Sequence, residues 1–232
     1  MQNQTITMAL FEQTIDQHSD FLGTLRHRFL DEDRKTALEA FALKGFPTKK
    51  DEEYKYTNLK EITEKNYNFF PTEEHHISRE QLDALHLGEE NFDRIVFING
   101  KLHKEFSKIS IGNAEFLSFN YALNDPAHKE VFDKYFNTIA NKDLAFTNLN
   151  SAYCKFGFFL RVPKNVVIEK PIHVFYLSQN QEENTFYNTR NLLIVEEGAK
   201  VEIIESHHNL DESFVLTNSV TEIFTYQNAK TD

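Results

Sequence analysis

A short pattern recurs in the C-terminal part of the chain at nearly constant spacing. Each copy has a turn residue, a small or branched apolar residue and then alternating β-formers, and the copies begin at Asn165-Val166, Gly198-Ala199 and Asn228-Ala229. The offset between the first two copies is 33 (198 minus 165), and between the last two it is 30 (228 minus 198). Strands and turns at a constant period are typical of a β-solenoid, whose stacked turns bury a core that no single turn can bury. Asn and Gly suit the repeated corner because both tolerate a positive φ.

The composition changes near Leu160. Residues 1–160 hold 11 Val and Ile, whereas the shorter segment 161–232 holds 14, and Phe falls from 18 to four. Because β-branched side chains favour strands, the sequence predicts an α+β N-terminal region followed by a parallel β-helix (β-solenoid). We expect a helical region over 1–92, a mixed α/β connecting region over 93–157 and the start of the β-helix core over 158–232. An antiparallel sandwich, with turns every 8–12 residues, is the alternative.

The third copy of the pattern begins only four residues before Asp232. A solenoid needs about three repeats and a polar cap, so this β-helix is expected to be truncated after about two coils. We therefore expect the chain to be the front part of a longer protein. An uncapped last coil exposes a strand edge, which predicts self-association through the C-terminal coil.

Local signals place several elements before the repeat. Ser78 with Gln81 forms a capping box, and Asn99-Gly100 predicts a two-residue hairpin turn. Asp125-Pro126 predicts a helix running to about Phe136, and a further helix is expected over Leu144 to Tyr153. Helices are also expected around Phe21–Phe29 and Leu38–Ala42, with Gly45 as the stop, and a short helix is expected within 46–62.

Charge and composition exclude several classes of protein. The chain carries 25 Lys and Arg against 36 Asp and Glu, a net charge of −11, which argues against nucleic-acid binding. Its sequence shows no apolar run near the roughly 18 residues of a membrane span and no signal-peptide pattern. A single Cys excludes an internal disulfide. We expect no membrane or nucleic-acid partner and a cytoplasmic location.

A few residues could carry chemistry, and each has a structural interpretation that we favour. Cys154 is expected to be a buried structural thiol on a helix. His75-His76 lie in a polar loop, and His207-His208 follow strand residues, where one of them could join Glu205 but a solvated turn is favoured. The acids of Asp51 to Glu53 suit the start of a helix. We therefore assign no catalytic, cofactor-binding or metal-binding residue.

Five ordered motifs resemble one family. The string GFPTKKDEEYKYTNL ends at Leu59; the others are VFINGKLHKEFS, LNSAYCKFGFFLRVPKNVVIEKPIHVFYL, RNLLIVEEGAKVEIIE and TNSVTEIFTYQNA. In this order they resemble the SufB/SufD family of scaffold subunits in the SUF iron–sulfur cluster assembly machinery, over residues 45–232. The helical region after DEEYKYTNL favours the SufD branch, although Tyr54 stands where that branch usually has Trp.

The resemblance implies a non-catalytic scaffold in a SufBCD-type complex with a SufB-like paralogue and a SufC-like ATPase. It implies that an iron–sulfur cluster, with flavin as a further candidate, belongs to the complete complex and that this chain binds no cofactor itself. The seven glycines form no phosphate-binding loop, so ATP hydrolysis is assigned to a partner. The alternative function is a β-solenoid module that binds or modifies carbohydrate, because fold alone does not decide function.

Overall fold

The computed structural model describes residues 9–25, 30–71, 74–85, 91–179 and 184–232. The helices are α1 (Ala9–Asp16), α2 (His18–Gly23), α3 (Asp31–Lys44), α4 (Lys60–Thr63), α5 (Arg79–Ala84), α6 (Phe119–Asn124), α7 (Lys129–Tyr135) and α8 (Ala145–Tyr153), with 3₁₀ helices η1 (Glu52–Tyr54) and η2 (Pro126–His128). The strands are β1 (Asp93–Ile98), β2 (Lys101–Leu102), β3 (Glu115–Ser118), β4 (Phe158–Val162), β5 (Ile172–Ser178), β6 (Thr185–Val195), β7 (Lys200–Val201), β8 (Ile203–Asn209), β9 (Val215–Thr225) and β10 (Lys230–Thr231). No helix in these ranges is both long enough and apolar enough to cross a bilayer.

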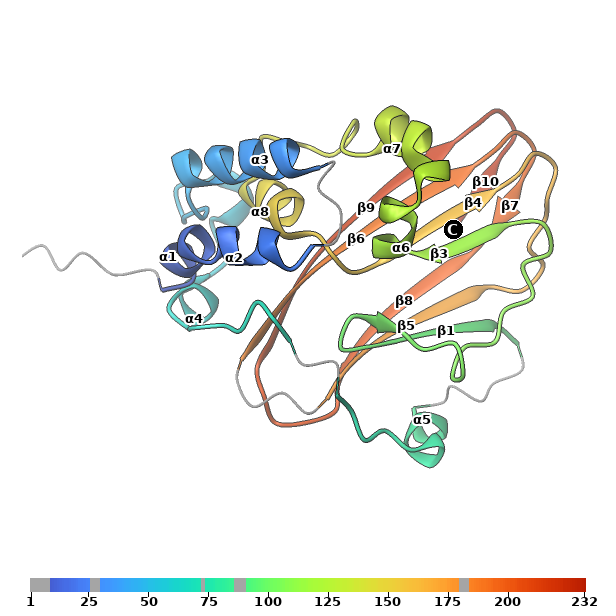
Figure 1. The fold of residues 1–232 in the computed structure, drawn as a ribbon, viewed down its shortest axis with the longest axis horizontal. Helices are drawn as coiled ribbons and strands as arrows, with labels where there is room; N and C mark the ends of the chain where they lie inside the picture. Colours follow the sequence, from blue (N-terminus) through green and yellow to red (C-terminus); the bar gives the residue numbers. More distant parts are fainter. Residues whose placement is uncertain (1–8, 26–29, 72–73, 86–90, 180–183) are drawn as a thin grey trace, which may run out of the picture.

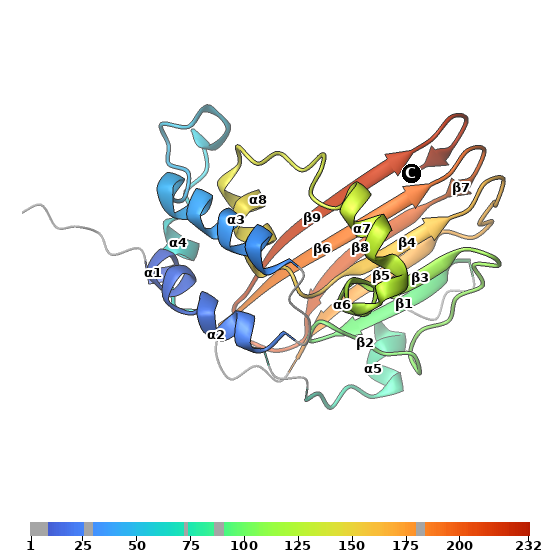
Figure 2. The same cartoon turned by 45° about the horizontal axis from the view of Figure 1, so that its top comes forward.

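The strands form two four-stranded sheets, ordered β2-β1-β5-β8 and β3-β4-β6-β9, and a two-stranded sheet of β7 and β10. Helices α1 to α4 and α8 gather at one end of the sheet that contains β6 and β9, while α6 and α7 lie over that sheet (Figures 1 and 2). Helix α5 lies on the outer side of the other sheet (Figure 1). The predicted α+β character is confirmed.

The spacing of the sequence repeat reappears as strand register. Strands β4 and β6 pair in parallel with Phe159 opposite Leu192, an offset of 33 (192 minus 159). Strands β6 and β9 pair in parallel with Thr185 opposite Val215, an offset of 30 (215 minus 185). Strands β5 and β8 are also parallel neighbours. The repeat thus identifies which strands lie side by side.

The prediction that these strands form a parallel β-helix over 158–232 is wrong. The described strands make three separate open sheets, and none of these sheets closes into a solenoid. Two of the pairs, β1 with β2 and β3 with β4, are antiparallel. Strands that precede the repeat extend both large sheets, because β1 pairs with β5 and β3 with β4. The spacing of a sequence repeat shows which strands within the repeat are neighbours, but it gives no information on strands outside the repeat that extend the sheets. For this reason the sequence wrongly predicted that the strands close into a solenoid.

The turns follow the predicted backbone chemistry. Asn165, Gly198 and Asn228, the three repeated corners, have φ values of 60°, 68° and 58°. The hairpin between β1 and β2 turns at Asn99 and Gly100, which also have positive φ. These corners need residues that tolerate the left-handed region, so the Asn and Gly pattern has a direct conformational cause.

The predicted helix signals are borne out where local chemistry defines them. Ser78 and Gln81 form the capping box of α5 with both reciprocal hydrogen bonds, and the Asp125 carboxylate accepts from the Ala127 N–H at the start of η2. Helix α8 begins one residue after Leu144 and ends at Tyr153 as predicted. The stretch 46–62 forms only η1 and the start of α4.

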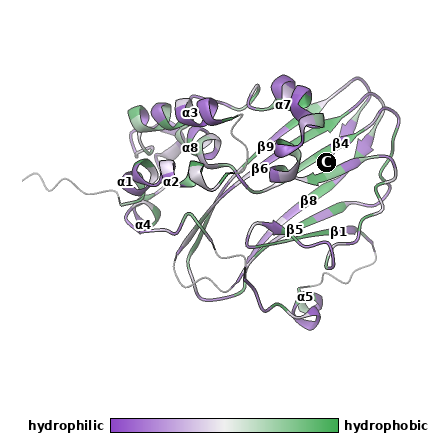
Figure 3. Ribbon diagram, viewed as in Figure 1, coloured by the Kyte–Doolittle hydropathy of each residue, from purple (hydrophilic) through white to green (hydrophobic). Residues whose placement is uncertain are grey.

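The apolar core lies between the two large sheets, with further clusters under the helices. Its buried members come from all three sheets and their connections: Ile95, Phe97, Phe158, Leu160, Val162, Ile168, Ile172, Val174, Tyr176, Leu193, Val195, Ala199 and Val201. On the outer face of the sheet with β6, Leu192 and Ile194 pack instead with residues of α6 and α7. Leu193 and Val195 face the core between the sheets, so successive residues of β6 point to opposite faces. Figure 3 shows hydrophobic stretches, in green, along the strands of both large sheets.

Val201 is 1% exposed in this shared core, whereas Val167 is 47% exposed beside it in the same region of the fold. Val201→Asp would bury an unpaired carboxylate, so we expect it to lower the free energy of unfolding by about 3 kcal/mol or more. Urea denaturation followed by circular dichroism measures the change. Val167→Asp is the matched control and should shift stability by no more than about 0.5 kcal/mol. If both substitutions lowered the free energy of unfolding by the same amount, Val201 would not be part of the core between the sheets.

Candidate functional site

The inner faces of the two large sheets change from apolar to polar along their strands. At one end Val174, Leu193 and Val195 belong to the shared core. Further along β5, β6 and β8 the same faces carry Tyr176, Ser178, Tyr187, Thr189, Glu205, His207 and Asn209. We call this second half the polar interior.

Asn191 stands where the apolar and polar halves meet, and it is fully buried. Its Oδ1 accepts hydrogen bonds from the Phe158 N–H at 3.0 Å and the Tyr176 hydroxyl at 3.1 Å. Its Nδ2 donates to the Glu205 carboxylate oxygens at 3.0 and 3.1 Å and lies 3.1 Å from the Thr221 Oγ1. One amide thus connects β4, β5, β6, β8 and β9, and all of its strong hydrogen-bonding atoms have partners.

Gly157 makes room for this amide. It has a φ of +113°, and a Cβ placed on it would lie 2.1 Å from the Arg190 carbonyl oxygen and 2.6 Å from the Asn191 Oδ1. A side chain at this position would therefore displace the backbone of β6 or the Asn191 amide. Gly157 is therefore needed for the close approach of two segments.

Glu205 and His207 lie two residues apart on the inner face of β8. Glu205 is exposed at the surface of the fold, yet partial burial of its carboxyl raises its pKa, and the hydrogen bonds from Asn191 and Thr221 oppose that rise. Burial, with a smaller contribution from His208, lowers the pKa of His207, whose ring stacks on Tyr176 at 4.7 Å with an interplanar angle of 10°. Each group is thereby shifted toward its uncharged form, which suits hydrogen bonding and proton exchange better than ion pairing.

A second polar cluster occupies the opposite face of the same strands. The Arg190 guanidinium and the Glu222 carboxylate form an ion pair of 2.5 Å, with side chains 0% and 1% exposed. Arg190 also donates to the Asn150 Oδ1, the Ser151 Oγ and the Asn137 Oδ1. We call this set the Arg190–Glu222 cluster.

Glu222 fixes the segment before α8 as well. Its carboxylate accepts from the backbone N–H groups of Asn137, Ile139 and Ala140 at 2.8 to 3.3 Å. The Phe136 ring lies 4.8 Å from the Arg190 guanidinium. The cluster therefore ties β6 and β9 to α8 and to the chain between α7 and α8, and we interpret it as structural.

Sequence analysis missed this cluster. The sequence numbers of Arg190 and Glu222 differ by 32, which is close to the repeat spacing, so the two residues are expected on neighbouring strands. The sequence signal for the cluster was an arginine and a glutamate at that offset, each flanked by strand-forming residues. It was not used because the period does not tell whether a polar side chain faces solvent or a covering helix.

Cys154 is fully buried as predicted, but it directly follows the last residue of α8 and has an extended backbone instead of lying on the helix. Its Sγ contacts the Ser151 carbonyl oxygen at 3.7 Å and the Arg34 Nη1 at 3.6 Å. Arg34 of α3 also donates to the Cys154 carbonyl oxygen at 2.8 Å. The thiol is therefore packed between α3 and α8, which confirms the buried location and agrees with the structural interpretation.

The two His pairs are each split by the fold. His75 packs edge-on against His103 with ring centroids 4.5 Å apart, whereas His76 is exposed. His207 and His208 lie inside strand β8 rather than in a solvated turn, and they face opposite sides of the sheet. The His207 ring stacks on Tyr176 and lies on the same face of β8 as Glu205. The His208 Nε2 lies 3.2 Å from the Ser206 Oγ on the other face. The preference for a solvated turn was wrong, and the predicted alternation of faces is confirmed.

Among the described residues, no group of three or more His, Cys, Asp or Glu side chains is arranged to hold a metal ion. The acids at the predicted helix start have a local role. The Asp51 carboxylate accepts from the Thr48 N–H at 2.7 Å and from its hydroxyl at 3.1 Å, and these bonds lower the pKa of Asp51. This closes the turn that precedes η1.

Comparison with known proteins identifies the family. A family model described as "SufBD protein N-terminal region" matches residues 3–174, and a model described as "SUF system FeS cluster assembly, SufBD core domain" matches residues 176–232. The fold and these matches define an α+β protein of the iron–sulfur cluster assembly class. The chain belongs to the SufBD family, which confirms the resemblance found in its motifs.

Curated relatives carry the same description. An iron–sulfur cluster assembly SufBD family protein of Synechocystis sp. is 26% identical over 205 residues, covering 85% of this chain and 45% of that protein. Corresponding proteins of Staphylococcus saprophyticus and Staphylococcus aureus strain MRSA252 are 34% and 35% identical over 79 residues, covering 34% of this chain and 17% of each protein. The chain thus spans less than half the length of the curated relatives it matches.

The raised pKa of Glu205 predicts a pH dependence of stability. Because the fold favours the protonated carboxyl, the contribution of this group is fully present below its ordinary pKa of 4.5 and is lost as the pH rises through the raised value. Glu205→Gln removes this titration. Melting temperatures from pH 4 to 8 should show the native protein losing stability relative to the variant as the pH rises. Parallel melting curves for the two proteins across this range would contradict the prediction.

The Arg190–Glu222 cluster predicts a large cost for removing one partner. Arg190→Met leaves the Glu222 carboxylate buried without its guanidinium, so we expect a loss of about 3–5 kcal/mol in the free energy of unfolding. The double variant Arg190→Met/Glu222→Gln should lose less than the sum of the single variants. Arg161→Met, which breaks the partly exposed pair with Glu196, is the matched control and should cost at most about 1 kcal/mol. Denaturant titration measures all of these variants, and additive single effects would refute the coupling.

Proposed function

We propose that this protein is a non-catalytic scaffold subunit in iron–sulfur cluster assembly. The observation that carries the proposal is the pair of SufBD family matches, which together reach from residue 3 to residue 232. The relatives named as iron–sulfur cluster assembly proteins support the same role. Because the chain spans less than half of those relatives, the activity of the whole protein is part of the proposal.

We further propose that it works with a SufB-like paralogue and a SufC-like ATPase, as a SufD-type subunit. The sequence has seven glycines and no Gly-rich phosphate loop among them, so a partner would supply ATP hydrolysis. The motif DEEYKYTNL and the helical region after it support the SufD branch. A cytoplasmic location follows from this role and belongs to the same proposal.

We assign the iron–sulfur cluster to the complete complex and not to this chain alone. Iron–sulfur clusters usually take four ligands, mostly thiolates, whereas this chain has one Cys, which is packed between α3 and α8. Ligands from elsewhere would have to complete any cluster site. We assign flavin to the same complex and none to this chain alone.

Self-association through the C-terminal strands stays a prediction for this chain. The carbohydrate-binding alternative rested on a closed β-solenoid, and the described sheets do not form one.

Coexpression tests the proposal. The affinity-tagged protein, expressed from its own gene together with the SufB-like and SufC-like proteins of the same genome, should retain both through gel filtration at physiological salt. The retained complex should hydrolyse ATP, and the tagged protein alone should not. A tagged acidic protein of similar size controls for charge-driven capture. Failure to retain either partner under anaerobic and aerobic conditions would refute the scaffold role.

A further inference from the structure

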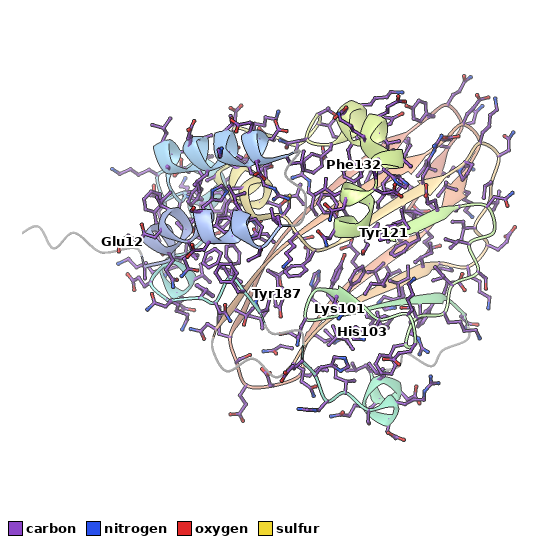
Figure 4. The ribbon with its side chains drawn as sticks, viewed as in Figure 1. Glu12, Lys101, His103, Tyr121, Phe132 and Tyr187 are labelled. Carbon is purple, nitrogen blue, oxygen red and sulfur yellow. The ribbon has the colours of Figure 1, made fainter. Side chains whose placement is uncertain are left out.

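A cavity of about 110 Å³ lies where the hairpin of β1 and β2 meets α6 and the segment that joins α8 to β4. Its wall is formed by residues 100–102, by Ser118 and Asn120, and by residues 155–157. Figure 4 labels Lys101 on β2 and Tyr121, the neighbour of Asn120 on α6, so two sides of the cavity can be found there. Lys101 and Asn120 are exposed, so the cavity reaches solvent.

The cavity lies at the edges of the two large sheets that β2 and β3 form. In both sheets the strand order runs from these edges to β8 or β9 at the opposite edge. Every residue of the wall precedes β4 in the sequence, whereas β8 and β9 come near the last residue of the chain. The wall is therefore built without the C-terminal strands.

Two contacts hold the segments of the wall together. Gly100 packs directly on the Phe156 ring, where an added Cβ would lie 2.2 Å from the Phe156 Cδ1. The Phe119 N–H donates to the Gly157 carbonyl oxygen at 2.8 Å, which keeps the start of α6 beside the segment before β4. The cavity is thus formed by the fold before any ligand arrives.

Two lysines contribute positive charge to the wall. The ammonium groups of Lys101 and Lys155 can donate hydrogen bonds but cannot accept them. The Lys155 Nζ lies 5.7 Å from the centroid of the Phe156 ring, which is itself part of the wall, so this charge stays close to the cavity. As far as described residues form it, the wall contains no Asp or Glu.

Two neutral side chains add further donors. The Asn120 Oδ1 accepts from the Asn124 Nδ2 at 3.1 Å, so the Asn120 amide has its Nδ2 left to donate. Ser118 precedes α6, and within the described fold its hydroxyl makes no capping hydrogen bond to that helix. Two cationic and two neutral donors therefore surround one small cavity.

These features select an anion. The chain has a net charge of −11, so most of its surface repels anions. Lys101 and Lys155 repel each other across the cavity, and a bound anion replaces this repulsion by charge-assisted hydrogen bonds. A volume of about 110 Å³ exceeds the roughly 30 Å³ that one water molecule occupies in the liquid, so the cavity has room for an ion with several oxygen atoms.

We propose that this cavity binds a small free oxyanion of the phosphate or sulfate type. Lys101 and Lys155 neutralise its charge, and Ser118 and Asn120 donate to its remaining oxygens. The site uses neither Cys154 nor the Arg190–Glu222 cluster, so it is independent of the proposed scaffold role in its chemistry.

Inorganic phosphate is the probe, added to the full chain at constant ionic strength with sodium chloride as the replacement salt. Isothermal titration calorimetry should show one phosphate bound per chain. The melting temperature should rise with phosphate concentration, because the ligand binds the folded state only. Sulfate should compete with phosphate, and acetate should bind about tenfold more weakly, since its two oxygens meet fewer donors.

Variants of the wall separate ligand binding from folding. Lys101→Met and Lys155→Met should each weaken phosphate binding about tenfold or more, and Ser118→Ala about two- to tenfold. Because none of these side chains is buried, the melting temperatures without phosphate should stay close to that of the native protein. Lys104→Met is the matched control: this lysine is exposed and lies outside the wall, so the variant should bind phosphate as the native protein does.

Several outcomes would overturn the proposal. Absence of phosphate binding at millimolar concentration would show that the cavity holds water only. Equal stabilisation by chloride at the same ionic strength, or equal weakening by Lys104→Met, would show that general screening and not the cavity is responsible. Tighter binding of AMP than of phosphate would show that the site recognises a phosphate ester instead of a free ion.

Discussion

The buried ion pair between Arg190 and Glu222 is the constraint on which the arrangement of helices and sheets depends. Two charges that are 0% and 1% exposed must be paired, since either one alone would carry a desolvation penalty of several kcal/mol. Their pairing is diagonal across β6 and β9, where Arg190 is opposite Val220 and Glu222 is opposite Leu192. A shift of one residue in register would move one of the charges to the other face of its strand, so the pair fixes the register of the two longest strands. Through Asn150 and the backbone N–H groups near Asn137 it also fixes where α8 sits on them.

Strand β6 carries two unrelated polar systems on its two faces. All of its eleven residues are buried, although the central Asn-Thr-Arg-Asn segment is polar. Arg190 faces the helices and Asn191 faces the interior, where it holds the Tyr176 hydroxyl and the Glu205 carboxylate. Neighbouring residues of one strand thereby connect the helical side of the molecule to its polar interior, and Gly157 allows both to fit by leaving the Arg190 carbonyl and the Asn191 amide unobstructed.

Features defined by residues close together in the sequence were predictable. The capping box of Ser78 and Gln81 and the turn at Asn99-Gly100 depend on a few neighbouring residues, and both form. The repeat spacing also predicted which strands are neighbours, because parallel pairing keeps that offset. Closure of the sheets was mispredicted, since it depends on strands added from outside the repeat. The polar interior was missed for a related reason: a strand with polar residues at consecutive positions has no alternation to show which face is buried.

The polar interior is not explained by packing alone. One half of the space between the sheets is filled by Val174, Leu193, Val195 and similar side chains, which shows that these strands can build an apolar core. In the other half the same faces present polar groups, among which the Tyr176 hydroxyl and the Glu205 carboxylate both bond to the Asn191 amide. The contrast between the two halves of one interior, built by the same strands, therefore reflects a hydrogen-bond network centred on Asn191 rather than an inability of these strands to pack.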